Sequence, residues 1–200
     1  LCLLFLTSSV FGQFGNQRNR GPRPNKGYGA RMFQFQIYNF ASLKEENKTR
    51  VDIHFSLVND LLTFVHEQDG YKAGYEINAV IKDQNKEIVV FETTAAQVSV
   101  KNFEQTNARL NPHRHKLSFH LEPGQYKYEL QVYDDETGLI LERKNDLVVR
   151  NFVSSAIHMS DIIFTDELEE LENAWKMTPN LNNVFNNMKS SFSAFFEVYP

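Results

Sequence analysis

The sequence predicts an all-β protein, an immunoglobulin/fibronectin-like antiparallel β-sandwich with the start of a second β domain. Residues 121–138 give the clearest evidence, because between two turns their apolar residues alternate with polar ones, as in a strand with one face in water. The same period of two recurs in short segments separated by turn residues, which is typical of a sandwich. A hydrophobic content of 42%, with 17 Phe and 8 Tyr, is enough for a core. A closed barrel is the alternative.

Residues 1–12 predict a truncated signal peptide. The apolar run 1–11 is about half as long as a membrane span requires, and the basic region that normally precedes such a run is missing. Val10 and Gly12 suit a cleavage site before Gln13; the alternative interpretation is a strand. Export would place the protein in the periplasm or at the cell surface. Cys2, the only cysteine, lies in this segment, so the mature chain would have no thiol for a disulfide or a metal.

Residues 13–31 predict a disordered basic linker rich in Gly and Pro. The segment has too few apolar residues to offset its ordering entropy, and it carries five basic residues and no acid: Arg18, Arg20, Arg23, Lys26 and Arg31. We expect a solvated tether, and the alternative is a basic arm, 14–31, in weak contact with an anionic surface. The net charge of −4 argues against a nucleic-acid partner.

Residues 32–155 predict the β-sandwich domain. Alternating segments lie at 33–38, 51–57, 62–66, 71–82, 88–91, 96–100, 116–121, 126–132, 139–142 and 147–150. Asp69-Gly70 is a hairpin turn signal between two of them. Tyr126 comes directly after a tight turn. It fits two interpretations equally, a tyrosine corner whose hydroxyl bonds upstream backbone, or a plain aromatic at the edge of the core.

The character of the sequence changes after residue 155. Residues 156–180 predict a linker, with one further short strand at 160–165 and a helix-like stretch at 166–176. In that stretch Leu168, Leu171 and Trp175 have helical spacing, acids come first and Lys176 comes last. Residues 181–200 predict the first strand of a second, truncated β domain, because apolar and polar residues alternate again at 192–199.

Three groups of residues could carry chemistry, and each has a simpler structural interpretation. His113 and His115 share one face of a strand, but no third metal ligand is near in sequence and Arg114 and Lys116 would repel a cation. We therefore expect a solvated loop and strand end there, with His120 on the opposite face. The carboxylates of Asp134, Asp135 and Glu136 could bind calcium but lack the usual spacing, so a hairpin turn with Gly138 at positive φ is favoured.

Catalytic patterns are absent from the sequence. It has no Gly-x-Ser-x-Gly, no His-Glu-x-x-His and no phosphate-binding glycine loop. The acids Glu167, Glu169, Glu170 and Glu172 are explained more simply as a solvated helix face than as a general acid and base. The sequence therefore predicts no catalytic, cofactor-binding or metal-binding residues.

The order of several segments resembles the N-terminal region of the GWxTD domain-containing proteins, which are exported bacterial proteins of unassigned activity. The segments are VNDLLTFVHEQDGYKAGYEINAVIKDQNKEIV, LEPGQYKYELQVYDDETG, IHMSDIIFT, MTPNLNNVF and SFSAFFEVY, over residues 51–199. The resemblance implies a β-sandwich followed by a second β domain, with 166–176 as a linker between them. The motif that names the family is absent here, since Trp175, the only tryptophan, stands in Asn-Ala-Trp-Lys.

The expected function is that of an exported, non-catalytic binding or spacer module of the cell envelope, with a protein or an envelope glycan as partner. The alternative is an accessory domain of a larger envelope enzyme whose catalytic part lies beyond residue 200. A glycan-binding module is a third interpretation, but Tyr38, Tyr71 and Tyr133 are too scattered in the sequence to define an aromatic platform.

Overall fold

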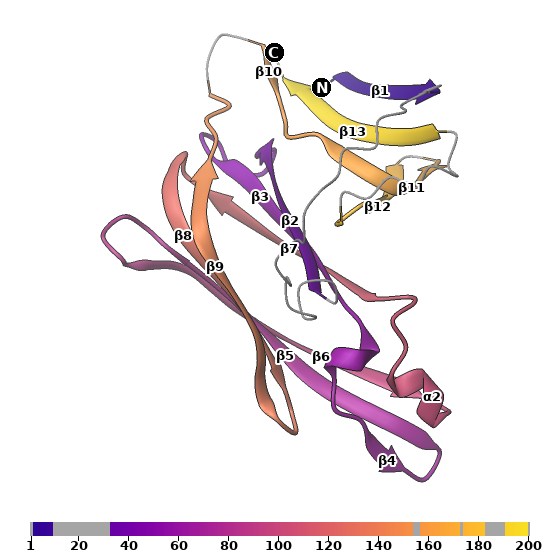
Figure 1. Ribbon diagram of the computed structural model, residues 1–200. Helices are drawn as coiled ribbons and strands as arrows, with labels where there is room; N and C mark the ends of the chain where they lie inside the picture. The colour runs from indigo at the N-terminus through magenta and orange to yellow at the C-terminus, as the bar shows by residue number, and fades with distance from the viewer. Residues whose placement is uncertain (1, 10–32, 154–156, 173, 183–190, 200) are drawn as a thin grey trace, which may run out of the picture.

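A computed structural model describes residues 2–9, 33–153, 157–172, 174–182 and 191–199, and the predicted arm at 14–31 lies outside them. These residues form three antiparallel sheets (Figure 1). Two of them form the predicted sandwich, so the β-sandwich fold is confirmed. No helix among the described residues is long and apolar enough to span a membrane.

The larger sheet of the sandwich is built around a long hairpin. Strands β5 (Gly70–Lys82) and β6 (Ile88–Val100) pair along their whole length. The other side of β5 pairs with β4 (Val65–Glu67) at its start and with β8 (Gly124–Asp134) further on, and β8 pairs with β9 (Gly138–Val149). Residues 88–91 and 96–100, predicted as two segments, belong to the single strand β6, and 139–142 and 147–150 both belong to β9.

The second sheet has the order β2 (Phe33–Ala41), β3 (Thr49–Leu57) and β7 (His113–Leu121). Its odd-numbered residues on β3 and β7 face the larger sheet and form the core with β5 and β8. Leu130 and Val132 of β8 are 1% and 0% exposed and stand beside Ala79 and Ile77 of β5, as their alternation predicts.

The third sheet lies at one end of the sandwich (Figure 1). Strand β13 (Ser191–Tyr199) pairs with β1 (Cys2–Ser9) on one side and with β10 (His158–Met159) and β11 (Ile163–Leu171) on the other. The strand predicted at 192–199 is confirmed, and the stretch 156–180, predicted as a linker, carries β10, β11 and β12 (Ala174–Pro179). Residues 2–9 of the predicted leader form a strand here, and cleavage before Gln13 stays a prediction.

Residues 166–176 form neither the helix nor the linker that were the two interpretations of this stretch. Residues in this stretch form the hairpin of β11 and β12, in which Leu168 stands opposite Met177, and the Glu169 carboxylate lies 3.6 Å from the Lys176 ammonium. The start of β11 is already fixed by pairing of Ile163 with Phe195 on β13. Tertiary pairing therefore overrides a helical spacing that rested on a few residues.

The even-numbered face of β3 is buried, although its alternation predicts a solvated face. Asp52 and Ser56 are both 2% exposed. The third sheet accounts for part of this burial, because Tyr38 and Phe40 of β2 pack against Ile163 and Phe195 on the same side of the second sheet. A strand between two layers can keep polar residues only where they are hydrogen-bonded or paired.

The Tyr126 hydroxyl donates to the backbone carbonyl of Glu122 at 3.0 Å, which is the hydrogen bond of a tyrosine corner. The ring is half-buried rather than buried. Burial is the main reason that the pKa of Tyr126 is raised. Of the two interpretations of Tyr126, the structure therefore favours the tyrosine corner.

Candidate functional site

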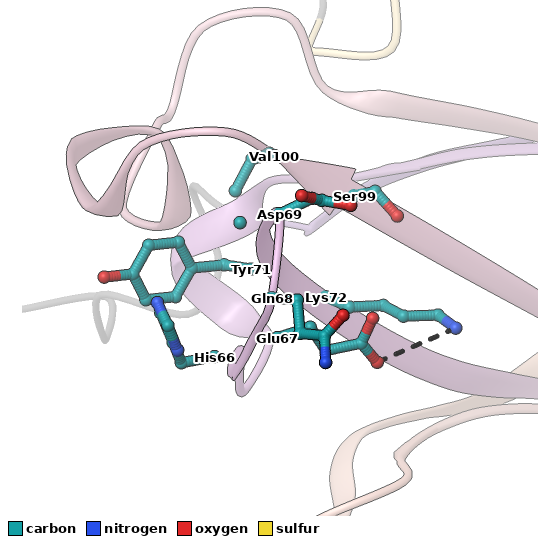
Figure 2. Close-up of a pocket in the computed structure, with 9 residues that line it drawn as sticks. His66, Glu67, Gln68, Asp69, Tyr71, Lys72, Ser99 and Val100 are labelled. Carbon is teal, nitrogen blue, oxygen red and sulfur yellow. Dashed lines mark ion pairs between the residues drawn. The ribbon is translucent and has the colours of Figure 1, made fainter.

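Two adjoining open clefts lie at the end of the sandwich opposite the third sheet. We call them together the end cleft. The first has a volume of about 710 Å³ and the second of about 760 Å³, and they share the β4–β5 turn. The first is drawn in Figure 2. Together the clefts are lined by the turn residues 66–72 and by residues 99–104, which include the first two residues of the short helix α2 (Phe103–Thr106).

The β4–β5 turn depends on Gly70, as the Asp69-Gly70 signal predicts. Gly70 has φ +144°, a conformation that residues with a side chain rarely adopt. A Cβ atom there would also clash with the carbonyl oxygen of Val100. The turn therefore packs directly on the end of β6, and Gly70 and Val100 both line the end cleft.

Three rings form a row along the end cleft. The His66 and Tyr71 rings are 5.0 Å apart, centroid to centroid, and the Tyr71 and Phe103 rings are 5.8 Å apart; both pairs meet edge to face. Phe103 is 64% exposed, so its ring is available for a ligand. Figure 2 shows the Tyr71 ring beside His66, whereas Lys72 projects to the other side of the strand.

Polar groups also line the end cleft. Gln68, Asp69, Asn102 and Glu104 do so. Glu67 and Lys72, whose carboxylate and ammonium are 3.9 Å apart, lie on the other side of the strand from the Tyr71 ring (Figure 2). Carboxylates and amides near exposed rings can hydrogen-bond a ligand that carries many hydroxyls while its apolar faces stack.

A capping box stabilises helix α2 and thereby fixes the position of Phe103. The Gln105 side chain accepts from the backbone N–H of Lys101 at 2.9 Å and of Asn102 at 3.1 Å. The Asn59 side chain donates to the Gln105 carbonyl at 2.7 Å and ties α2 to the 3₁₀ turn η1 (Asn59–Leu61). Phe103 was not singled out from the sequence. The spacing of Asn102 and Gln105, which is that of a capping box, is the signal that could have indicated a helix start at Phe103.

The three tyrosines considered as a platform do not form one. Tyr38 is 7% exposed in the contact between the second and third sheets. Tyr133 lies on β8 and donates to the Gln131 side chain at 3.1 Å. Only Tyr71 lines the end cleft, where its aromatic neighbours are His66 and Phe103.

His113 and His115 lie at the start of β7, as the predicted strand end requires, but they are half-buried rather than solvated. His115 Nε2 lies 2.7 Å from the Tyr75 hydroxyl, and its ring stacks 5.1 Å from that of Phe55. His113 Nε2 lies 2.6 Å from the Asn59 side-chain oxygen. Burial lowers the pKa of both His113 and His115, so they serve as neutral hydrogen-bonding groups at the core edge.

One hydroxyl–histidine pair that the sequence does not reveal is formed by Ser42 and His120, whose Oγ and Nδ1 atoms are 2.8 Å apart. The same Oγ accepts from the backbone N–H of Glu45 at 2.9 Å and of Lys44 at 3.3 Å. The Ser42 hydroxyl oxygen therefore already accepts hydrogen bonds within the β2–β3 loop. The Ser42–His120 pair stabilises this loop rather than acting as a nucleophile and its base.

The turn prediction for residues 134–138 is confirmed. Asp134 is buried, and its Oδ1 accepts from the backbone of Glu136 and from the backbone and hydroxyl of Thr137. Its Oδ2 accepts from the Thr63 N–H at 2.6 Å, and Gly138 has φ +85°. Burial by itself raises the pKa of Asp134, but these hydrogen bonds outweigh it and hold the pKa below its ordinary value.

A second polar cluster lies on the buried even-numbered face of β3. Asp52 is 2.8 Å from the Lys116 ammonium, 3.3 Å from the Arg50 guanidinium and 2.8 Å from the Ser118 hydroxyl. Burial, followed by repulsion from Lys116, lowers the pKa of His54 to about 4. Among the described residues no three His, Cys, Asp or Glu side chains converge as a metal site would require.

No family model and no curated protein match the sequence, so the resemblance to the GWxTD proteins stays a prediction. Among solved structures, a Bacteroides fragilis protein assigned as a β-galactosidase matches 63% of this chain, with 14% identity and a TM-score of 0.40. The chain spans only 17% of the length of that protein. This distant similarity transfers no activity to the present chain.

Proposed function

We propose that this protein is an exported, non-catalytic binding module of the bacterial cell envelope, and that it holds an envelope glycan in the end cleft. The row of His66, Tyr71 and Phe103 is the observation that carries the proposal, because it puts one highly exposed ring beside a second ring in an open cleft. Sugar rings stack on such aromatic faces, and their hydroxyls bond to carboxylates and amides.

A binding role also fits the rest of the described chemistry. The buried side chains of Asp134, His115 and Asp52 are engaged in hydrogen bonds with neighbours inside the protein. The end cleft, by contrast, combines accessible polar groups with a highly exposed ring. A protein partner is the other candidate, and it would engage the same exposed Phe103 without a requirement for sugar.

Co-sedimentation with purified peptidoglycan sacculi tests the proposal. We expect wild-type protein to pellet with sacculi, and Tyr71→Ala and Phe103→Ala to weaken that binding about fivefold or more, since loss of one aromatic contact costs about 1 kcal/mol or more. Tyr133→Ala is the matched control and should bind as wild type does. Equal retention of all four proteins would reject the end cleft as the site.

The non-catalytic part of the proposal has its own test. The sacculi should be recovered with no soluble fragments released, and the protein should not hydrolyse peptide, ester or glycoside substrates. Release of fragments that is abolished in Ser42→Ala would show that the Ser42–His120 pair is catalytic and would overturn this part of the proposal.

A further inference from the structure

Strand β6 is an edge of the larger sheet. One side of it pairs with β5 over residues 88–100, and no described strand pairs with the other side. Along that free side the backbone N–H and C=O groups can pair with another strand. At 13 residues, β6 is also about twice as long as a common strand.

The opposite edge of the same sheet is protected in a way that β6 is not. Strand β9 carries four charged residues in succession or nearly so: Glu142, Arg143, Lys144 and Asp146. Strand β6 carries one, Glu92, and has neither Lys nor Pro. Charges, prolines and bulges are the usual means of keeping strand edges from pairing. Strand β6 has one charge and one bulge, which lies at its start beside Val89, so its regular part from Val90 to Val100 is open to a partner strand.

Exposed apolar side chains lie along the same strand. Ile88, Val89 and Phe91 are 59%, 46% and 66% exposed. Phe91 lies on the outer face of the sheet, opposite Val80, and Val89 lies at the bulge, whereas Val90 lies on the inner face and packs only partly against the core. A partner strand beside β6 would cover apolar side chains on both faces.

We propose that β6 pairs antiparallel with β6 of a second copy of this chain, around a two-fold axis at Thr94. In this register Val90 stands opposite Val98 of the copy, and Phe91 stands opposite Gln97. Glu92 stands opposite Ala96, and the two copies of Glu92 are about 13 Å apart along the strands, so no like charges meet. A strand that is complementary to itself in this way favours a closed two-fold dimer.

The mass of the whole chain in solution, measured by light scattering over a range of concentrations, tests the pairing. We expect a mass twice the 23.3 kDa of one chain at high concentration. The variant Val89→Lys/Phe91→Lys should raise the dissociation constant about tenfold or more. Val148→Lys/Leu110→Lys, which changes two other exposed apolar residues, is the matched control and should dimerise as wild type does.

Disulfide formation tests the register. In a Cys2→Ser background, Thr94→Cys should form a disulfide-linked dimer under mild oxidation, since position 94 of one chain stands directly opposite position 94 of the other. Asn145→Cys on β9 should stay monomeric. A monomer at all concentrations, a dimer that is unaffected by the two lysines on β6, open-ended aggregates, or equal cross-linking of both cysteine variants would overturn the proposal.

Discussion

Asp134 should be among the most sensitive polar residues of the fold. One of its oxygens accepts three hydrogen bonds from its own turn, and the other accepts the Thr63 N–H from the segment between η1 and β4. In Asp134→Asn the amide oxygen can replace Oδ1, but the amide NH₂ then points at the Thr63 N–H. One charge-assisted bond is lost and one buried donor is left unpaired, which costs about 2–4 kcal/mol of unfolding free energy.

Urea unfolding at pH 7 measures this cost, with Asp135→Asn as the matched control. Asp135 is the exposed neighbour of Asp134, and the same isosteric change there should cost less than about 0.5 kcal/mol. Because the folded-state pKa of Asp134 lies below 3.8, its contribution is complete above about pH 4 and is lost as the pH falls through the lower folded-state value. Equal stability of the two variants at pH 7 would refute the assignment of Asp134 as the anchor of this turn.

Three further predictions follow from the core, the buried histidine and the leader. Leu130→Ala should cost about 2–5 kcal/mol in urea unfolding, against about 0.5 kcal/mol for Gln125→Ala on the exposed face of the same strand, and similar losses would contradict the assigned faces. Folding lowers the pKa of His54 from 6.5 to about 4, so protonation of this residue favours the unfolded state. The free energy of unfolding should therefore stay level above pH 6.5 and fall by about 3 kcal/mol as the pH decreases to 4. His54→Gln should flatten this slope when stability is measured against pH. N-terminal sequencing of exported protein should begin at Gln13, and recovery of an intact leader on exported protein would contradict the cleavage prediction.

The sequence was sufficient to predict the sandwich because each strand carries its own local signal. Several confirmed features depend only on residues within a few positions of each other. They are the alternation around Leu130, the Asp69-Gly70 turn and the positive φ of Gly138. The buried polar face of β3 could not be predicted in this way. It is covered by strands more than 100 residues later in the chain, and alternation does not reveal a third layer.

The candidate site was not predicted from the sequence, for the same physical reason. Tyr71 was noted, but its ring neighbour Phe103 is about thirty residues away and reaches it through α2, whose capping box is its only local signal. The histidines of β7 were misjudged because their partners, Tyr75 and Asn59, lie on other elements. Contacts between distant segments decide whether such residues are solvated. Period-two alternation within one strand carries no information on these contacts.

The binding surface itself gives the most direct test of the account. An NMR titration of the isotope-labelled chain with soluble glycan-strand fragments of peptidoglycan would locate the ligand residue by residue. We expect the largest chemical-shift changes on residues 66–72 and 99–104, and much smaller changes at the same ligand concentration in Phe103→Ala. Changes centred on any other surface, or the same changes in Phe103→Ala, would contradict the assignment of the end cleft as the glycan site.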